Sequence, residues 1–277
     1  MTDTDKKMSI VAFGCGNMAA PILTGLWNGL NKSGNPSHWT LYTPSQTKAL
    51  VLADKFHGTC LKNLEAIPQA DVYILGMKPQ QLSDFAENVR GKLSSHSLVI
   101  SMLAGVSLEK LKKHIDHPNV LRLMPNTPSH VGLGVLPFYA HPEILEHLAW
   151  PKIRHAFESF NKVIPCRSEQ ELNLVTPYFG SGPAYFYEFV QVMADDLTSR
   201  GVDPKMAQDL MIHTCLGAAE MMAQSPESPN SLRDQVTSKG GVTAQALKVF
   251  QQEDRGLKKL VREAMEAALK RNAELND

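Results

Sequence analysis

The chain has 277 residues, and its 28 lysine and arginine residues balance 28 aspartate and glutamate residues. Hydrophobic residues make up 43% and charged residues 20%, an ordinary balance for a folded domain. This balance excludes a mainly electrostatic role on nucleic acid or on a membrane surface. No apolar run is long enough to span a bilayer, and the length is expected to give two domains.

The cysteines and histidines give no sign of a metal site. His114 and His117 have no cysteine or acidic cluster beside them, so no metal is expected. The polar start MTDTDKKMSIV has no apolar signal core, so the expected location is the cytoplasm. A reducing compartment is favoured because the four cysteines form no CxxC pair: Cys15, Cys60, Cys166 and Cys215.

A glycine-rich turn follows the first predicted strand. The apolar run Ser9–Phe13 predicts the strand, and an apolar-periodic segment after the turn predicts a helix. The turn fits the dinucleotide pattern G-x-G-x-x-A with Gly14-Cys15-Gly16-Asn17-Met18-Ala19. Gly14 permits the tight turn, Gly16 lets a pyrophosphate approach the backbone, and Ala19 lets the helix pack closely on the strand. The alternative is a plain strand–helix turn.

The second strand, expected at Trp39–Tyr42, ends in a polar segment. An NAD-specific site usually has Asp or Glu here for the ribose 2′-hydroxyl. The segment Thr43–Lys48 offers hydroxyls and a lysine, and no carboxylate follows before Asp54. Such groups suit a 2′-phosphate. The sequence therefore favours NADPH over NADH, and a solvated turn that binds nothing is the alternative.

Further strands alternate with helices in the first half. Near-continuous apolar runs predict buried parallel strands at Asp71–Gly76, Leu98–Met102 and Asn119–Met124. Helices are expected at Gln80–Lys92 and Leu108–His114, and this alternation is typical of a doubly wound sheet. Ligands bind beyond the C-terminal ends of such strands. One crevice is therefore expected to carry Gly14–Met18, Met77-Lys78, Ala104-Gly105 and Pro125–Thr127.

The first domain is expected to end near Arg167-Ser168, where the strand signals stop. Before that boundary, Gly134–Tyr139 and Val163–Cys166 are expected as edge strands, with the helix Pro151–Phe160 between them.

From Glu169 onward the chain reads as helical. Helices are expected at Ala184–Ser199, from Pro204 to about Gln224, and at Leu257–Leu275. Asp203 before Pro204 is typical of a helix start. Several helices are apolar on more than one face, which indicates burial in a bundle or a subunit interface. An intertwined homodimer would bury these faces, and a self-contained monomeric bundle is the alternative.

The segment Ser231–Leu247 reads as a helix, a tight break and a second helix that starts near Thr243. Gly240 and Gly241 let backbone amides approach a ligand. The first turn of a helix has unpaired N–H groups and a partial positive charge, which suit a carboxylate. Thr243 is expected to cap that turn or to direct its hydroxyl to the ligand. The alternative is a helix–turn–helix joint with a glycine C-cap.

Five motifs, in this order and spacing, resemble pyrroline-5-carboxylate reductase from about Ser9 to Leu275: GCGNMA, the Lys78-Pro79 strand exit, MPNTP, GSGPAY and LRDQVTSKGGVT. The resemblance implies an α/β fold with an N-terminal Rossmann-type domain (8–167) for NAD(P)H. An all-helical domain (168–277) for substrate binding and dimerisation would follow it, and the dimers often assemble into rings. It also implies hydride transfer to the imine carbon of 1-pyrroline-5-carboxylate, which gives L-proline.

The resemblance also implies the residues of the site. Thr243 would be the catalytic residue, because the family threonine is thought to hydrogen-bond the ring nitrogen. The substrate would lie against Val236, Thr237, Ser238, Gly240, Gly241, Val242 and Thr243. The cofactor contacts are expected at Gly14, Cys15, Gly16, Asn17, Met18, Thr43, Ser45, Asn63, Met77, Lys78, Pro79, Ala104 and Asn126.

Departures from the family pattern keep other functions open. Lys239 stands where the family usually has proline, Val242 replaces threonine or alanine, and Tyr178-Phe179 replaces a smaller pair. A divergent reductase of a related cyclic imino acid is therefore one alternative. An NADP-dependent β-hydroxy acid dehydrogenase commonly uses a lysine on the first long helix of its second domain, and Ala184–Ser199 has none. The third alternative, a non-catalytic NADP-binding regulator, is opposed by the intact substrate loop.

Overall fold

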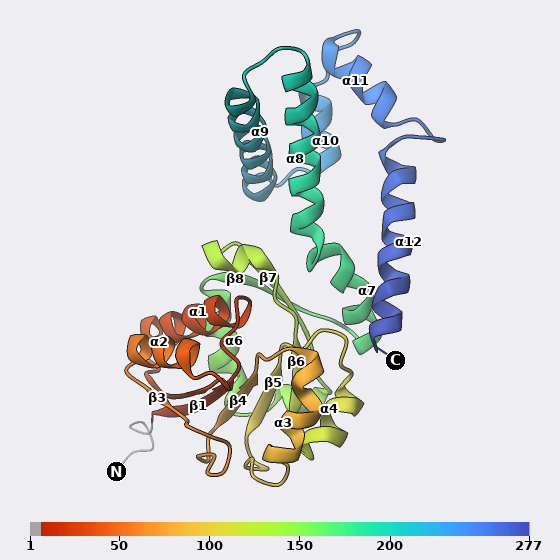
Figure 1. Ribbon diagram of the computed structural model, residues 1–277. Coiled ribbons are helices and arrows are strands. Elements are labelled where there is room, and N and C mark those ends of the chain that lie inside the picture. The colour runs from red at the N-terminus through yellow and green to blue at the C-terminus, as the bar shows by residue number, and fades with distance from the viewer. Residues whose placement is uncertain (1–6, 277) are drawn as a thin grey trace. The chain divides into compact units, whose positions relative to one another are not determined.

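The computed structural model describes residues 7–276. Contacts divide the chain into two compact units (Figure 1). The sheet unit contains the chain up to Gly180 and again from Arg271 onward, and the helical unit is Ser181–Lys270. This division lies 13 residues after the boundary that the strand signals predict at 167, because the first helix after that point, α7 (Glu169–Phe179), is attached to the sheet.

The sheet unit is built on eight strands in the order β3-β2-β1-β4-β5-β6-β7-β8. Strands β1 to β6 are parallel, β7 is antiparallel to β6, and β8 is parallel to β7. The strands are β1 (Met8–Phe13), β2 (Ser37–Tyr42), β3 (Thr59–Cys60), β4 (Val72–Leu75), β5 (Leu98–Ser101), β6 (Val120–Leu123), β7 (Gly134–Tyr139) and β8 (Asn161–Pro165).

Helices cover both faces of this sheet, so the predicted doubly wound arrangement is confirmed. Helices α1 (Ala19–Lys32), α2 (Thr47–Phe56) and α6 (Trp150–Glu158) pack on one face, where Ile10 and Ala12 of β1 point. Helices α3 (Leu82–Val89) and α4 (Leu108–Ile115) pack on the other face with Val11 and Phe13 (Figure 1). The alternation of side chains along a strand thus feeds two separate apolar cores.

The segment Gly134–Tyr139 is a strand, but the expectation that it lies at an edge is wrong. It becomes β7 and lies between β6 and β8, because β8 pairs along its whole length with parallel register from Gly134–Asn161 to Phe138–Pro165. The short elements of this unit are the 3-10 helices η1 (Pro79–Gln81) and η2 (Thr127–Val131), and α5 (Pro142–Leu145).

The helical unit contains α8 (Gly182–Ser199), α9 (Pro204–Gln224), α10 (Pro229–Gln235), α11 (Val242–Phe250) and most of α12 (Leu257–Asn276). Asp203 is the N-cap of α9, and its side chain accepts a hydrogen bond from the amide of Met206, as predicted. Helices α8 and α9 pack against each other, yet each leaves large apolar side chains exposed, such as Phe186 at 65% and Leu216 at 56%.

No helix within residues 7–276 is both long and apolar enough to cross a lipid bilayer.

Candidate functional site

The glycine turn after β1 is held against the end of β4. Gly14 has φ +95°, and a Cβ there would lie 2.4 Å from the amide nitrogen of Met77. Its own amide donates to the carbonyl of Tyr42 at 2.8 Å, which ties the turn to the end of β2 as well. Only glycine fits this position, because both the backbone conformation and the space exclude a side chain.

Gly16, two residues later, has different surroundings. No other described residue beyond its chain neighbours has an atom within 4 Å of the point where a Cβ would stand. The backbone here therefore faces open space, as a loop that cradles a pyrophosphate requires. Behind the loop, Ala19 is buried, and a Cβ on Gly76 would lie 2.7 Å from the Ala19 methyl group, so α1 starts in close contact with the end of β4.

The end of β2 lies beside this loop. The Lys48 Nζ atom, in the first turn of α2, donates to Oδ1 of Asn17 at 3.0 Å. The Oγ1 atom of Thr43 is buried and has no hydrogen-bond partner among the described residues. A lysine ammonium and a hydroxyl with unused hydrogen-bonding capacity suit a phosphorylated ribose.

Asn63 follows β3 on the same edge. Nε2 of Gln46 donates to the carbonyl of Lys62 at 3.1 Å, which joins this turn to the one after β2. Oδ1 of Asn63 accepts from the amide of Glu65 at 3.1 Å, so the Asn63 side chain shapes its own turn. Ser45 likewise stabilises its own turn, because its carbonyl accepts a hydrogen bond from the amide of Thr47 at 2.7 Å.

The next strand exits lie further along the same edge, because β1, β4, β5 and β6 are adjacent and parallel. Met77, Lys78 and Pro79 follow β4, and Oε1 of Gln81 accepts from the amide of Lys78 at 3.1 Å. Ala104 follows β5 and is exposed. The topology therefore brings together the four segments that were expected to share a crevice.

Asn126, after β6, is 5% exposed and both ends of its side-chain amide are engaged. Oδ1 accepts from the amide of Val135 at 2.9 Å, and Nδ2 donates to the carbonyl of Phe179 at 3.1 Å. The side chain of Asn126 thus joins the end of β6 to the start of β7 and to the end of α7.

The turn also contains a cysteine that does not react readily. Cys15 is buried in the core beneath the loop, and desolvation by burial, helped by the nearby Cys60, raises the pKa of its thiol to about 12. At neutral pH this group is a thiol, which is a weak nucleophile. Cys15 therefore contributes its backbone, rather than a reactive sulfur, to the surface of the loop.

The predicted substrate loop lies in the helical unit. Gly240 has φ +77°, and the amide of Gly241 donates to the carbonyl of Ser238 at 3.0 Å, which closes the turn. A Cβ on Gly241 would lie 2.3 Å from Oγ of Ser238, so a side chain there would require the Ser238 hydroxyl to move. Thr237 uses its hydroxyl locally, because Oγ1 donates to the carbonyl of Arg233 at 2.7 Å.

The N-cap of α11 is Gly241, so the option that Thr243 caps this helix is wrong. Thr243 is the second residue of the helix and is exposed, and its hydroxyl has no partner among the described residues. The cap belongs to Gly241 because the helix begins at Val242, two residues earlier than a Thr243 cap would require. The first amides of α11 have no acceptor within the helix, as at every helix start, and Val236 and Val242 lie exposed on either side of the turn.

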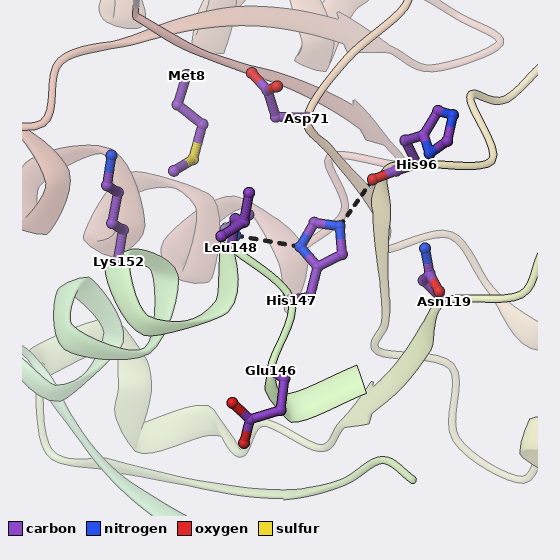
Figure 2. A pocket seen from close by; sticks show the side chains of 9 residues that line it. Met8, Asp71, His96, Asn119, Glu146, His147, Leu148 and Lys152 are labelled. Carbon is purple, nitrogen blue, oxygen red and sulfur yellow. Dashed lines mark hydrogen bonds between the residues drawn. The ribbon is translucent and has the colours of Figure 1, made fainter. Parts of the chain in front are cut away.

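A cavity of about 500 Å³ is lined by residues outside these segments, and Figure 2 shows its lining side chains. Met8 begins β1, Asp71 precedes β4 and Asn119 precedes β6, so the cavity is at the N-terminal edge of the sheet, opposite the predicted crevice. His147 in its wall is fixed as the Nε2–H tautomer, because Nδ1 accepts from the amide of Ala149 at 3.2 Å and Nε2 faces the carbonyl of His96 at 2.8 Å. The cavity is therefore separate from the predicted cofactor site.

Within the described part of the chain, no three His, Cys, Asp or Glu side chains come close enough to hold a metal ion. The features at the C-terminal edge fit a dinucleotide instead: a glycine that no side chain can replace, a glycine that faces open space, and an unused buried hydroxyl beside a lysine.

Comparisons with known proteins agree with this geometry. Residues 9–105 match the family model described as NADP oxidoreductase coenzyme F420-dependent, and residues 169–275 match the model for pyrroline-5-carboxylate reductase dimerisation. The fold and the glycine turn thus define an oxidoreductase with a Rossmann-type nucleotide-binding domain.

Individual curated relatives and solved structures identify the family more specifically. The chain is 35% identical to a pyrroline-5-carboxylate reductase of Vibrio alginolyticus over 98% of this chain and 97% of that protein, and 30% identical to one of Escherichia coli (98% and 99%). A pyrroline-5-carboxylate reductase structure from Coxiella burnetii has a TM-score of 0.84 at 30% identity (98% and 100%). A Plasmodium falciparum pyrroline carboxylate reductase with NADP bound has 0.79 at 25% (98% of each chain). The chain belongs to the pyrroline-5-carboxylate reductase family.

Proposed function

We propose that the protein reduces 1-pyrroline-5-carboxylate to L-proline with NADPH, the last step of proline biosynthesis. The observation that carries this proposal is the similarity to curated reductases of this family at 30–35% identity over nearly the whole of both chains. The glycine turn supports it, because Gly14 and Gly16 provide the tight bend and the open backbone that a dinucleotide needs.

The cofactor would bind along the C-terminal edge of the sheet. The pyrophosphate would lie on the backbone of Gly14–Met18, with the first turn of α1 behind it. Thr43, Ser45 and Asn63 would surround the adenosine ribose, and the cation of Lys48 beside Asn17 supports a preference for the 2′-phosphate of NADPH. The nicotinamide half would lie along the later strand exits: Met77, Lys78, Pro79, Ala104 and the backbone at Asn126.

The substrate would bind at the loop before α11. Its carboxylate would accept hydrogen bonds from amides of the Ser238–Val242 turn, where no atom of a described residue beyond the chain neighbours lies within 4 Å of the Cβ position of Gly240. Thr243 would place its unpaired hydroxyl at the ring nitrogen. Val236, Thr237 and Val242 would bound the pocket, and Lys239 would add a cation beside the carboxylate.

This reaction needs few acid–base groups from the protein. A cyclic imine that is protonated at nitrogen accepts hydride readily at the neighbouring carbon, and the reduced nicotinamide supplies hydride when bound. The protein residues would fix the carboxylate, orient the ring nitrogen through Thr243 and exclude water.

We also propose a homodimer, and rings of dimers as the larger assembly. The match to the dimerisation model over residues 169–275 and the exposed apolar side chains of α8 and α9 support this proposal. The cytoplasmic location stays a prediction.

A direct assay tests the proposed function. The purified chain is mixed with NADPH and 1-pyrroline-5-carboxylate, and both NADPH oxidation and proline formation are measured. NADH and piperideine carboxylate serve as comparison substrates, so that a divergent imino acid reductase is recognised. Thr243→Ala should lower turnover strongly and leave the Kd for NADPH nearly unchanged. Absence of proline formation by the wild-type protein would refute the proposal, and unchanged kinetics in the variant would refute the role of Thr243.

A further inference from the structure

Two prolines interrupt the helical pattern of backbone hydrogen bonds around the end of α7. In an α-helix the amide of each residue bonds the carbonyl four residues earlier, and proline has no amide hydrogen to donate. Pro177 lies inside α7, so the carbonyl of Asn173 lacks its helical donor. Gly180 and Ser181 keep right-handed helical dihedrals, so the residue whose amide would donate to the carbonyl of Phe179 is Pro183.

Each of these carbonyls receives its hydrogen bond from an asparagine far away in the sequence. Nδ2 of Asn272 donates to the carbonyl of Asn173 at 3.0 Å. Nδ2 of Asn126 donates to the carbonyl of Phe179 at 3.1 Å. An asparagine amide thus replaces the missing backbone donor in both places, and this avoids the cost of a carbonyl with no partner.

The two asparagines lie on different segments of the sheet unit. Asn272 is near the end of α12. Asn126 lies at the C-terminal end of β6, in the Met124–Pro128 loop that belongs to the predicted nicotinamide half of the crevice. Its other amide atom, Oδ1, holds the amide of Val135 at 2.9 Å, so the side chain has a fixed orientation.

The carbonyl that Asn126 holds belongs to the last residue of α7, and Gly180 after it is the last residue of this part of the sheet unit. The place where the chain leaves the sheet unit is thereby fixed to the crevice edge. The chain then continues into the unit that carries the proposed substrate loop.

We propose that Asn126 is a positioning residue for the reductase reaction, and that it acts by supplying the hydrogen-bond donor that Pro183 lacks. This inference rests on the proposed function for its kinetic consequence. In this role the side-chain amide of Asn126 bonds only backbone groups of the protein. A cofactor contact at this position would then come from the backbone of the loop.

The test uses two variants at Asn126 in the full-length protein. Asn126→Asp keeps an acceptor for the amide of Val135 and loses the donor to Phe179, whereas Asn126→Ala loses both. A displaced reacting group can cost up to about 100-fold in rate, so kcat should fall by about 10-fold or more, while the Kd for NADPH changes little. A larger primary isotope effect with 4-deuterated NADPH should accompany the fall.

A rescue variant separates this role from direct cofactor binding. Pro183→Ala restores a backbone N–H that can reach the carbonyl of Phe179, so it should recover part of kcat in the Asn126→Ala background and change little alone. Asn272→Ala is the matched control. It removes the same kind of bond at Pro177, and it should lower Tm without changing the isotope effect.

Hydrogen–deuterium exchange in the protein without cofactor provides a readout independent of activity. A peptide covering residues 175–185 should exchange faster in Asn126→Ala and should slow again in the double variant with Pro183→Ala. The proposal is overturned if Asn126→Ala raises the Kd for NADPH with kcat unchanged, if Pro183→Ala restores neither turnover nor protection, or if both Asn126 variants behave as wild type. A wild-type protein that makes no proline would instead refute the proposed function, and the exchange result would still decide the hydrogen-bond role.

Discussion

The Nη1 atom of Arg122 lies 2.6 Å from Oε1 of Glu169, and this pair attaches α7 to β6, an interior strand of the sheet. Arg122 is 1% exposed, in the third position of β6. The same oxygen of Glu169 accepts from the amide of Leu108 at 2.7 Å. The other end of α7 is held by Asn126, which donates to the carbonyl of Phe179, so α7 is attached to β6 at Arg122 and to the loop after β6 at Asn126.

Glu169→Ala should lower the free energy of unfolding by about 3–5 kcal/mol, because removal of one partner leaves a buried guanidinium without its counter-charge. Glu169→Gln is the control, since its amide oxygen can still accept from both donors and the loss should be smaller. Urea denaturation monitored by circular dichroism measures both values. A loss below about 1 kcal/mol in Glu169→Ala, the range of an exposed ion pair, would show that the pair contributes no more than a surface contact.

The two glycines of the glycine turn, Gly14 and Gly16, should respond differently to the same substitution. Gly14→Ala should lower Tm, because the new Cβ would meet the Met77 amide and the backbone has φ +95°. Gly16→Ala should leave Tm nearly unchanged, because its Cβ would enter open space, and it should weaken NADPH binding if a pyrophosphate uses that space. Thermal melts and NADPH fluorescence titrations give the two quantities. Equal effects of both variants on Tm would contradict this assignment.

Lys48 should set the preference for NADPH over NADH. A hydrogen bond to a charged group contributes about 1.5–3 kcal/mol, so Lys48→Glu should raise KM for NADPH by about 10-fold or more. The kcat/KM with NADH should change much less, because NADH has no 2′-phosphate. Lys55→Glu is the matched control, since Lys55 lies in the last turn of the same helix. A parallel loss with both cofactors would indicate that Lys48 supports the loop through Asn17 instead.

His117 should make stability fall on mild acidification. Desolvation by burial lowers its pKa below the usual 6.5, although the hydrogen bond to the Ser94 carbonyl partly opposes the shift. The contribution of neutral His117 to the free energy of unfolding is fully present above about pH 6.5. It is lost as the pH falls toward the lowered folded-state pKa, because the unfolded chain takes up the proton first. His117→Leu should flatten this part of the profile. Urea titrations at several pH values between 7.5 and 5 measure it, and an unchanged slope in the variant would contradict the assignment.

The exposed apolar side chains of α8 should lie in a subunit interface. Phe186 and Tyr187 are 65% and 66% exposed in the single chain, and a charge placed there would have to be buried on association. Phe186→Glu should therefore shift the protein toward monomer in light-scattering chromatography. Leu148→Glu is the control, because Leu148 is 90% exposed on the sheet unit. A dimer that tolerates Phe186→Glu would place the interface elsewhere.

Much of the fold could be predicted because its signals are local. Apolar runs located β1, β4, β5 and β6, and the Asp203-Pro204 pair located the start of α9. β3 has two residues, which is too short for a pattern, and the polar first turn of α2 concealed that helix. The interior place of β7 depends on its pairing with β8, and a single strand's composition does not reveal its neighbours.

For the candidate site, too, contiguous patterns could be predicted and contacts between distant residues could not. The glycine turn is predictable because its pattern is contiguous, and the structure supplies the reason for Gly14 in the close approach of Met77. The contacts from Lys48 to Asn17 and from Asn126 to Phe179 join residues 31 and 53 positions apart, so no local pattern predicts them. Arg122 was visible as the one charge within the apolar strand VLRL, and that signal could have indicated a buried ionic partner.

The buried sulfur of Cys15 has a practical consequence for the protein under oxidative stress. Peroxide and electrophilic drugs attack thiolates, and with a pKa of about 12 this side chain is almost wholly protonated in the cell. Hydrogen peroxide should therefore leave the thiol of the glycine turn unoxidised. Chemical labelling of the folded protein should instead mark the partly exposed Cys60, Cys166 or Cys215 first.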